Sequence, residues 1–93
     1  MTDLDQERRD ECRQVVLEFL ASRQAVAHHP QTICRRLNAG HLHDFTVEEI
    51  EAALAFRVSA QHAVIVYPEG GSTQYYQATA TGVLAHERGP STQ

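Results

Sequence analysis

Hydrophobic and polar positions follow a helical period along the first part of the chain and a strand period later. From about residue 5 to about residue 23, apolar residues return every three or four positions, which predicts an amphipathic helix. We expect its apolar stripe to face the core and its charged positions to face water. The stripe consists of Cys12, Val15, Val16, Phe19 and Leu20.

A second, shorter helix is predicted at residues 30–37. Pro30 suits the first helical position, where a backbone N–H would have no partner, and residues 38–40 (Asn-Ala-Gly) tolerate a left-handed helix end. Ile33 and Leu37 lie on one face of this helix. We therefore expect it to pack on the same core.

The third helix, residues 46–60, has the clearest start signal. Thr46 and Glu49 have the spacing of a capping box, and Phe45 and Ile50 flank that box as a hydrophobic staple does. We expect the first half of this helix to be amphipathic and the second half to be buried on most sides. That expectation rests on the stripe Val47, Ile50, Leu54 and Val58, and on a second apolar side formed by Ala52, Ala53, Phe56 and Ala60.

After residue 62 the period changes. Residues 64–67 are β-branched and aromatic, residues 68–73 are turn formers and residues 74–78 return, which predicts one β-hairpin. Thr79 then caps a short helix that runs to about Glu87. The predicted fold is α+β: three helices, a C-terminal β-hairpin and a short terminal helix. We expect one domain with its core at about residues 5–88, tails at 1–4 and 89–93, and disorder in the last few residues.

Composition restricts the class of protein. The 93 residues carry a formal net charge of -4, and all eight basic residues are arginine. No apolar run is long enough for a membrane span or a signal peptide, so we expect a cytoplasmic protein with no membrane partner. Cys12 and Cys34 lie within helical apolar patterns, which favours buried thiols over a disulfide.

The order of the predicted elements resembles the winged-helix superfamily over roughly residues 10–88. The resemblance rests on the helix pair at residues 30–37 and 46–60, the hairpin with its glycine-rich loop, and residues 76–82 (Tyr-Gln-Ala-Thr-Ala-Thr-Gly). This last run is similar to the Y-x-[L/A]-T-x-x-G pattern that follows the wing strand in many winged-helix regulators. The resemblance implies a small bacterial or phage regulator of transcription or genome maintenance. Its third helix would enter the DNA major groove, and its hairpin, the wing, would touch the backbone.

The charges do not suit that mode of docking. Asp44, Glu48, Glu49 and Glu51 surround the start of the third helix, and residues 64–77 carry no arginine or lysine. Carboxylates repel phosphates, whereas DNA affinity depends on cations that neutralise them. If double-stranded DNA is bound, by a monomer or a homodimer, its phosphates are expected to meet other residues. The candidates are Arg35, Arg36, Arg8, Arg9 and Arg13.

A module for protein association is the alternative. Tyr75 and Tyr76 point to opposite sides of a strand, so Tyr75 is exposed if Tyr76 packs inward. Acidic residues in a first helical turn also stabilise the helix itself, so their presence alone proves no binding role. Fold analogy favours DNA as the first expectation, and local charge favours a protein partner. The candidate protein contacts are Glu48, Glu49, Phe56 and Tyr75.

Metal binding and catalysis have little support. His41 and His43 could join Cys34 or the pair at residues 28–29, but no C-x-x-C or H-x-x-x-H spacing is present. The spacing of Ser59, Ser72, His62 and the carboxylates does not assemble a nucleophile with a base, and residues 70–71 (Gly-Gly) lack the helix and lysine of a phosphate loop. We expect no metal, no other cofactor and no enzymatic activity.

Overall fold

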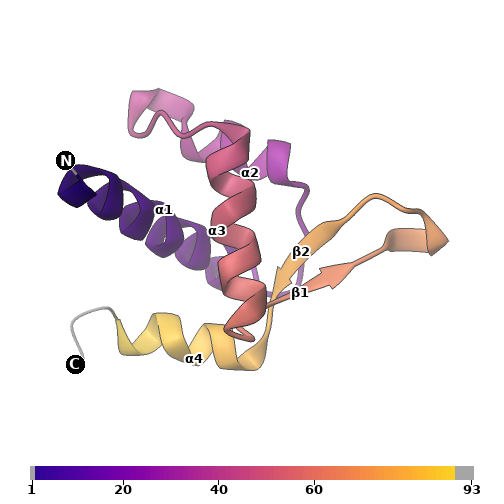
Figure 1. Ribbon diagram of the computed structural model, residues 1–93. Coiled ribbons are helices and arrows are strands. Elements are labelled where there is room, and N and C mark those ends of the chain that lie inside the picture. The colour runs from indigo at the N-terminus through magenta and orange to yellow at the C-terminus, as the bar shows by residue number, and fades with distance from the viewer. Residues whose placement is uncertain (1, 90–93) are drawn as a thin grey trace.

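The computed structural model describes residues 2–89 and has the α+β architecture that the sequence predicts. Three helices are followed by an antiparallel hairpin and a short C-terminal helix, an order compatible with a winged-helix-like arrangement. In Figure 1 the hairpin projects away from the helices. The predicted disorder of the last residues concerns positions outside the described part. The elements are α1 (Thr2–Ser22), α2 (Pro30–Leu37), α3 (Val47–Ser59), β1 (Ala63–Val66), β2 (Tyr75–Ala78) and α4 (Ala80–Arg88), with short 3-10 turns at Ala39–His41 and Pro68–Gly70.

The core lies where the apolar faces of α1, α2 and α3 meet. Its fully buried side chains come from all three helices, as the periodicity predicts. Each such burial contributes about 1.5 to 3 kcal/mol relative to exposure. Phe45, Ala63 and Tyr76 close the cluster from the connector and the hairpin. The largest fully buried side chains are Val16, Leu20, Ile33, Ile50 and Leu54.

Helix α1 differs from its prediction in length and in the number of buried sides. It begins at Thr2 rather than near residue 5, and it also buries Leu17 and Ala21, which lie outside the predicted stripe. The reason is α4, which packs against α1 and covers a second side (Figure 1). Among residues 2–89, no helix is both long and apolar enough to cross a membrane.

The hairpin is joined by a third extended segment. Ala63 pairs with Ala78 and Val66 with Tyr75, so β1 begins and ends one residue before its predicted bounds. Across β2, the backbone N–H groups of His28 and Tyr76 each donate to the other residue's carbonyl at 2.8 Å. Tyr76 is buried, as expected, and this bridge fixes the hairpin to the chain just before α2.

Helix α4 starts directly on the turn between α3 and β1. The Thr79 hydroxyl donates to the Gln61 carbonyl and accepts from the Gly82 N–H, while the Thr79 N–H donates to the His62 carbonyl. Gly82 lies so close that a β-carbon there would come within 2.1 Å of the His62 oxygen. The glycine that ends the Y-x-[L/A]-T-x-x-G run is therefore required by close packing.

The second half of α3 contradicts the expectation of burial on most sides. Ala53 and Leu54 are buried, but Ala52 and Phe56 are exposed, and the buried residue of the last turns is Arg57, at 5% exposure. Arg57 Nε and Nη2 donate to the Arg13 carbonyl at 3.1 and 3.0 Å, and Nη1 lies 3.0 Å from His62 Nδ1. Burial, followed by the nearby charge of Arg13, lowers the pKa of Arg57. A carbonyl at the middle of α1 thus replaces the carboxylate that a buried arginine normally requires.

Candidate interaction surface

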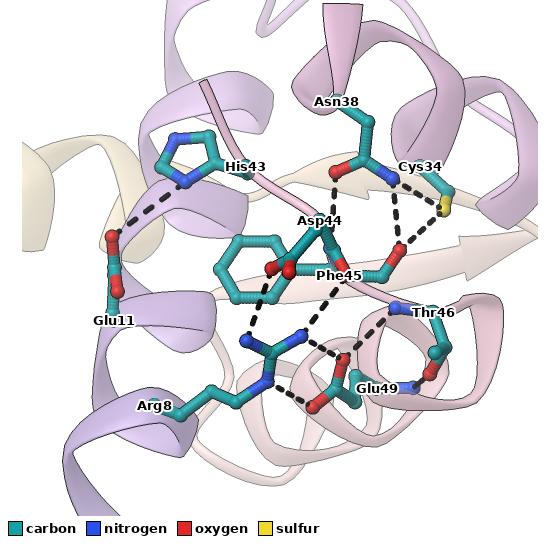
Figure 2. A network of polar contacts seen from close by, with 9 residues as sticks. All are labelled: Arg8, Glu11, Cys34, Asn38, His43, Asp44, Phe45, Thr46 and Glu49. Atoms are coloured by element: carbon teal, nitrogen blue, oxygen red, sulfur yellow. Dashed lines mark hydrogen bonds and ion pairs between the residues drawn. The ribbon is translucent and has the colours of Figure 1, made fainter. Parts of the chain in front are cut away.

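The start of α3 is held by a cluster of polar contacts (Figure 2). The predicted capping box is present: the Glu49 N–H donates to Thr46 Oγ1 at 3.1 Å, and the Thr46 N–H donates to Glu49 Oε1 at 2.9 Å. Arg8 reaches over from α1 and donates to both oxygens of Glu49, at 2.6 and 2.9 Å. It also donates to the carboxylate and the carbonyl of Asp44, each at 3.0 Å. We call Arg8, Asp44, Thr46 and Glu49 the α3 clamp.

The α3 clamp assigns an internal role to two of the candidate contacts. The sequence singled out Arg8 for phosphate and Glu49 for a protein partner, and the structure pairs them with each other. The charges of both side chains are therefore largely neutralised before any partner arrives. Arg8, and next the Thr46 N–H, lower the pKa of Glu49 from 4.5 to about 2.

Because the pKa of Glu49 is lowered on folding, its contribution to stability is present above pH 4.5 and is lost as the pH falls towards 2. We expect Glu49→Gln to lower the free energy of unfolding by about 1 to 2 kcal/mol at neutral pH, after allowing for the partial exposure of the pair. The deficit should shrink in urea titrations as the pH is lowered. Glu48→Gln, one position earlier and exposed, is the matched control. A deficit that is equal at pH about 7 and about 2.5 would show that the clamp does not stabilise the fold through charge.

The connector between α2 and α3 is also ordered by polar contacts (Figure 2). The Asn38 side chain donates to the Phe45 carbonyl at 2.8 Å and accepts from the Phe45 N–H at 3.1 Å. The Cys34 thiol donates to the same carbonyl at 3.3 Å. Both cysteines are buried free thiols, as predicted, and burial raises the pKa of Cys12 to about 11. These thiols serve packing rather than exchange chemistry.

The remaining candidate cations fall into two groups. On α1, the Arg13 guanidinium lies 3.9 Å from the centre of the Phe56 ring, and Arg9 donates to the Gln6 side chain at 2.7 Å. Arg13 therefore covers the exposed ring that the sequence proposed as a protein contact. On α2, Arg35 and Arg36 occupy the last turn and are exposed, and their guanidinium groups make no hydrogen bond or ion pair with the described residues. Of the five candidate arginines, these two are therefore the most available to a binding partner.

A hollow lies between the start of α2, the exposed side of α3 and the hairpin. It has a volume of about 470 Å³ and is lined by His29, Pro30, Glu51, Ser72, Gln74 and Tyr76. The Tyr75 ring packs edge-on against His29, with the ring centres 5.6 Å apart. Glu48 is exposed one turn before Glu51 on α3. We call the hollow, together with Glu48 and Tyr75, the α3–wing surface.

The α3–wing surface is acidic and carries amide, hydroxyl and aromatic groups. Gln74 spans two tyrosines: its Nε2 donates to the Tyr67 hydroxyl at 3.0 Å, and its Oε1 accepts from the Tyr76 hydroxyl at 3.2 Å. No arginine lines the hollow. Sequence reasoning chose Glu48 and Tyr75 but missed Glu51, His29 and Gln74 as parts of one surface. One signal in the sequence could have placed His29: it directly precedes Pro30, the predicted start of α2. In the structure its Nδ1 accepts a hydrogen bond from the Gln31 N–H, as an N-cap residue does.

The described residues offer no site for a metal ion. Within positions 2–89, no three side chains of the types His, Cys, Asp and Glu gather closely enough to hold one. His43, one of the considered ligands, instead stacks on Phe45 and has its Nδ1 3.6 Å from Glu11 Oε2. No model of a protein family matches the chain, and no curated protein matches it in sequence.

Proposed function

We propose that the protein is a winged-helix-like module for protein association, and that it binds its partner through the α3–wing surface. The observation that supports this most is the absence of a cation where winged-helix docking would bring a duplex. That surface carries Glu48 and Glu51, and no arginine lines its hollow. DNA binding at this face would place carboxylates next to phosphates. No cation of this surface would neutralise the phosphates and release their counterions, which is what drives DNA binding.

The chemistry of the α3–wing surface also indicates what kind of segment it takes. Two exposed carboxylates attract lysine or arginine side chains, and tyrosine rings offer contact area with little loss of side-chain entropy. Gln74 and Ser72 can donate and accept hydrogen bonds at the rim. The proposed partner is therefore a basic segment of another protein.

Binding to short labelled peptides tests the proposal. We expect a lysine- and arginine-rich peptide to bind and a glutamate-rich peptide of the same length not to bind. Glu48→Gln with Glu51→Gln should weaken binding about tenfold at low salt, because two attractive charges are lost. Glu87→Gln, an exposed carboxylate on α4, is the control and should bind as the wild type does. If all variants bind the basic peptide equally, the α3–wing surface is not the binding site.

Tyr75 gives a second, charge-independent test of the same surface. Tyr75→Ala removes a half-buried ring that packs against His29, one of the residues lining the hollow, so we expect weaker peptide binding with little change in the melting temperature. The control is Leu84→Ala, which removes an exposed apolar side chain from α4, away from this surface. Unchanged affinity in Tyr75→Ala would show that this ring is not a contact for the partner.

DNA association through α2 is the second candidate function. It is favoured by one observation, the exposed and unpaired neighbours Arg35 and Arg36 at the end of α2. If they contact phosphates, Arg35→Ala with Arg36→Ala should lower the slope of log affinity against log salt by about 2. Any DNA binding that keeps its salt dependence in this variant would exclude the two arginines as the contacts.

A further inference from the structure

His29 has two places in the structure at once: it caps α2, and it lines the hollow of the α3–wing surface. Its Nδ1 accepts a hydrogen bond from the Gln31 N–H at 3.1 Å. A ring nitrogen that accepts a hydrogen bond carries no proton, so the capping ring is the neutral tautomer with its proton on Nε2. The cap and the lining of the hollow therefore depend on the protonation state of one side chain.

A proton on Nδ1 of His29 would change both the cap and the hollow. Imidazole is the side chain whose charge ordinarily changes between about pH 5 and about pH 8. Protonation turns the acceptor into a donor, so the Gln31 N–H loses its partner and α2 loses its cap. The ring would then carry its positive charge at the positive end of the α2 dipole. Acid thus loosens the start of α2 and brings a cation to the hollow.

The groups that face His29 from the other elements carry a single charge. From α3, Glu51 supplies the one carboxylate among the residues that line the hollow. From the hairpin, Tyr75 contacts the His29 ring, and the other lining residues are uncharged polar side chains. The first turn of α2 carries no acidic residue, and the arginines of this helix are in its last turn. A protonated His29 would therefore balance the negative charge that Glu51 gives to the hollow.

The neighbouring histidine, His28, does not take the same part. Its ring packs edge-on against Phe19 of α1, with the ring centres 4.8 Å apart, and it does not line the hollow. Burial, followed by the nearby charges of Arg23 and Arg36, lowers the pKa of His28. Its ring therefore stays neutral to a lower pH than an exposed imidazole does. Of the residues that line the hollow, only His29 can become a cation.

We propose that His29 is an acid switch on the α3–wing surface, and that protonation of its ring releases the basic partner segment. At neutral pH the α2 cap is closed and the carboxylate of the hollow attracts a cation. In acid the imidazolium repels the basic segment, and the uncapped start of α2 loosens beside it. The inference rests on the proposed function for its partner, whereas the change at His29 is a property of the chain alone.

NMR of the unbound chain tests the change at His29 without any partner. Long-range proton–nitrogen spectra at about pH 8 should show the His29 ring as the Nε2–H tautomer. The protection of the Gln31 amide against hydrogen exchange should then fall as the ring gains its proton. In His29→Asn that protection should not change with pH, because asparagine is a good N-cap and carries no charge. A neutral ring with its proton on Nδ1, or Gln31 protection that does not follow the ring, would overturn the proposal.

Binding of the lysine- and arginine-rich peptide tests the release, because both residue types keep their charge throughout this pH range. Between about pH 7.5 and about pH 5.5, we expect the wild type to lose affinity at least about threefold at low salt. His29→Asn should bind about equally at both values. His41→Asn is the matched control and should behave as the wild type does, since His41 is exposed and outside the hollow, and asparagine tolerates its left-handed φ.

The outcomes separate the switch from the proposed function. Equal wild-type affinity at both pH values, or an equal loss in His29→Asn, would exclude His29 as the switch. No peptide binding at either pH would overturn the proposed function and, with it, the release of a partner. The tautomer of His29 and the protection of Gln31 would still decide whether protonation opens the α2 cap.

Discussion

Gly82→Ala is expected to destabilise the protein by about 3 kcal/mol, the largest effect we predict for so small a change. The added β-carbon would lie 2.1 Å from the His62 carbonyl oxygen and 2.9 Å from the carbonyl carbon. Both are backbone atoms, so no flexible side chain can move aside. Helix α4 would have to lift from the turn, at the cost of the Thr79 hydrogen bonds that seat it. Urea denaturation of the variant and the wild type measures the loss.

Gly71→Ala is the matched control for Gly82→Ala. Its β-carbon would meet the Pro68 oxygen at 3.4 Å, an ordinary contact, and its φ of -69° suits any residue. We expect a change within about 0.5 kcal/mol. Equal stabilities of the two alanine variants would contradict the close seating of α4 on the α3–β1 turn.

Arg57→Ala is expected to cost about 2 to 4 kcal/mol, because it empties a buried position and removes the hydrogen bonds between α3 and α1. The lost contacts are the two to the Arg13 carbonyl and the one to His62. Arg57→Met keeps most of the buried volume and removes the charge, so it should cost markedly less than alanine. Thermal and urea unfolding of both variants measure how much of the stability depends on the buried volume of the side chain and how much on its charge.

Comparing the two Arg57 variants shows whether hydrogen bonding or packing accounts for the loss of stability. If methionine costs as much as alanine, the guanidinium hydrogen bonds carry the effect. If methionine equals or exceeds the wild type, burial of the charge is a net cost that packing offsets. Only a neutral Arg57→Ala would contradict the burial of this side chain between the helices.

Local signals in the sequence predicted the elements well, because their causes are local. The capping box at Thr46 and Glu49 involves residues three apart, and Pro30 and the hairpin turn also act within a few positions. The buried stripes of α1 and α3 follow from periodicity in the same way. The second buried side of α1, which α4 covers, could not be predicted from the pattern of α1 alone.

The candidate site depended on pairings between distant residues, which no single stretch encodes. Arg8 and Glu49 lie 41 positions apart in the sequence and form an ion pair with each other. The sequence alone named each as a separate binding candidate, because it does not show this pairing. The burial of Arg57 against the carbonyl of Arg13, 44 positions away, likewise has no signal in the sequence around it. The hollow could not be predicted from the sequence either, because His29, Glu51 and Gln74 come together only where α2, α3 and the hairpin meet.

The α3–wing surface is proposed to bind a basic protein segment in preference to nucleic acid. Fluorescence anisotropy of a labelled random duplex, at about 50 mM and about 200 mM salt, decides this most directly. We predict no saturable binding of the duplex even at the lower salt, in the same buffer in which the basic peptide binds. Saturable duplex binding at low salt that falls steeply at higher salt, and strengthens in Glu48→Gln with Glu51→Gln, would contradict it.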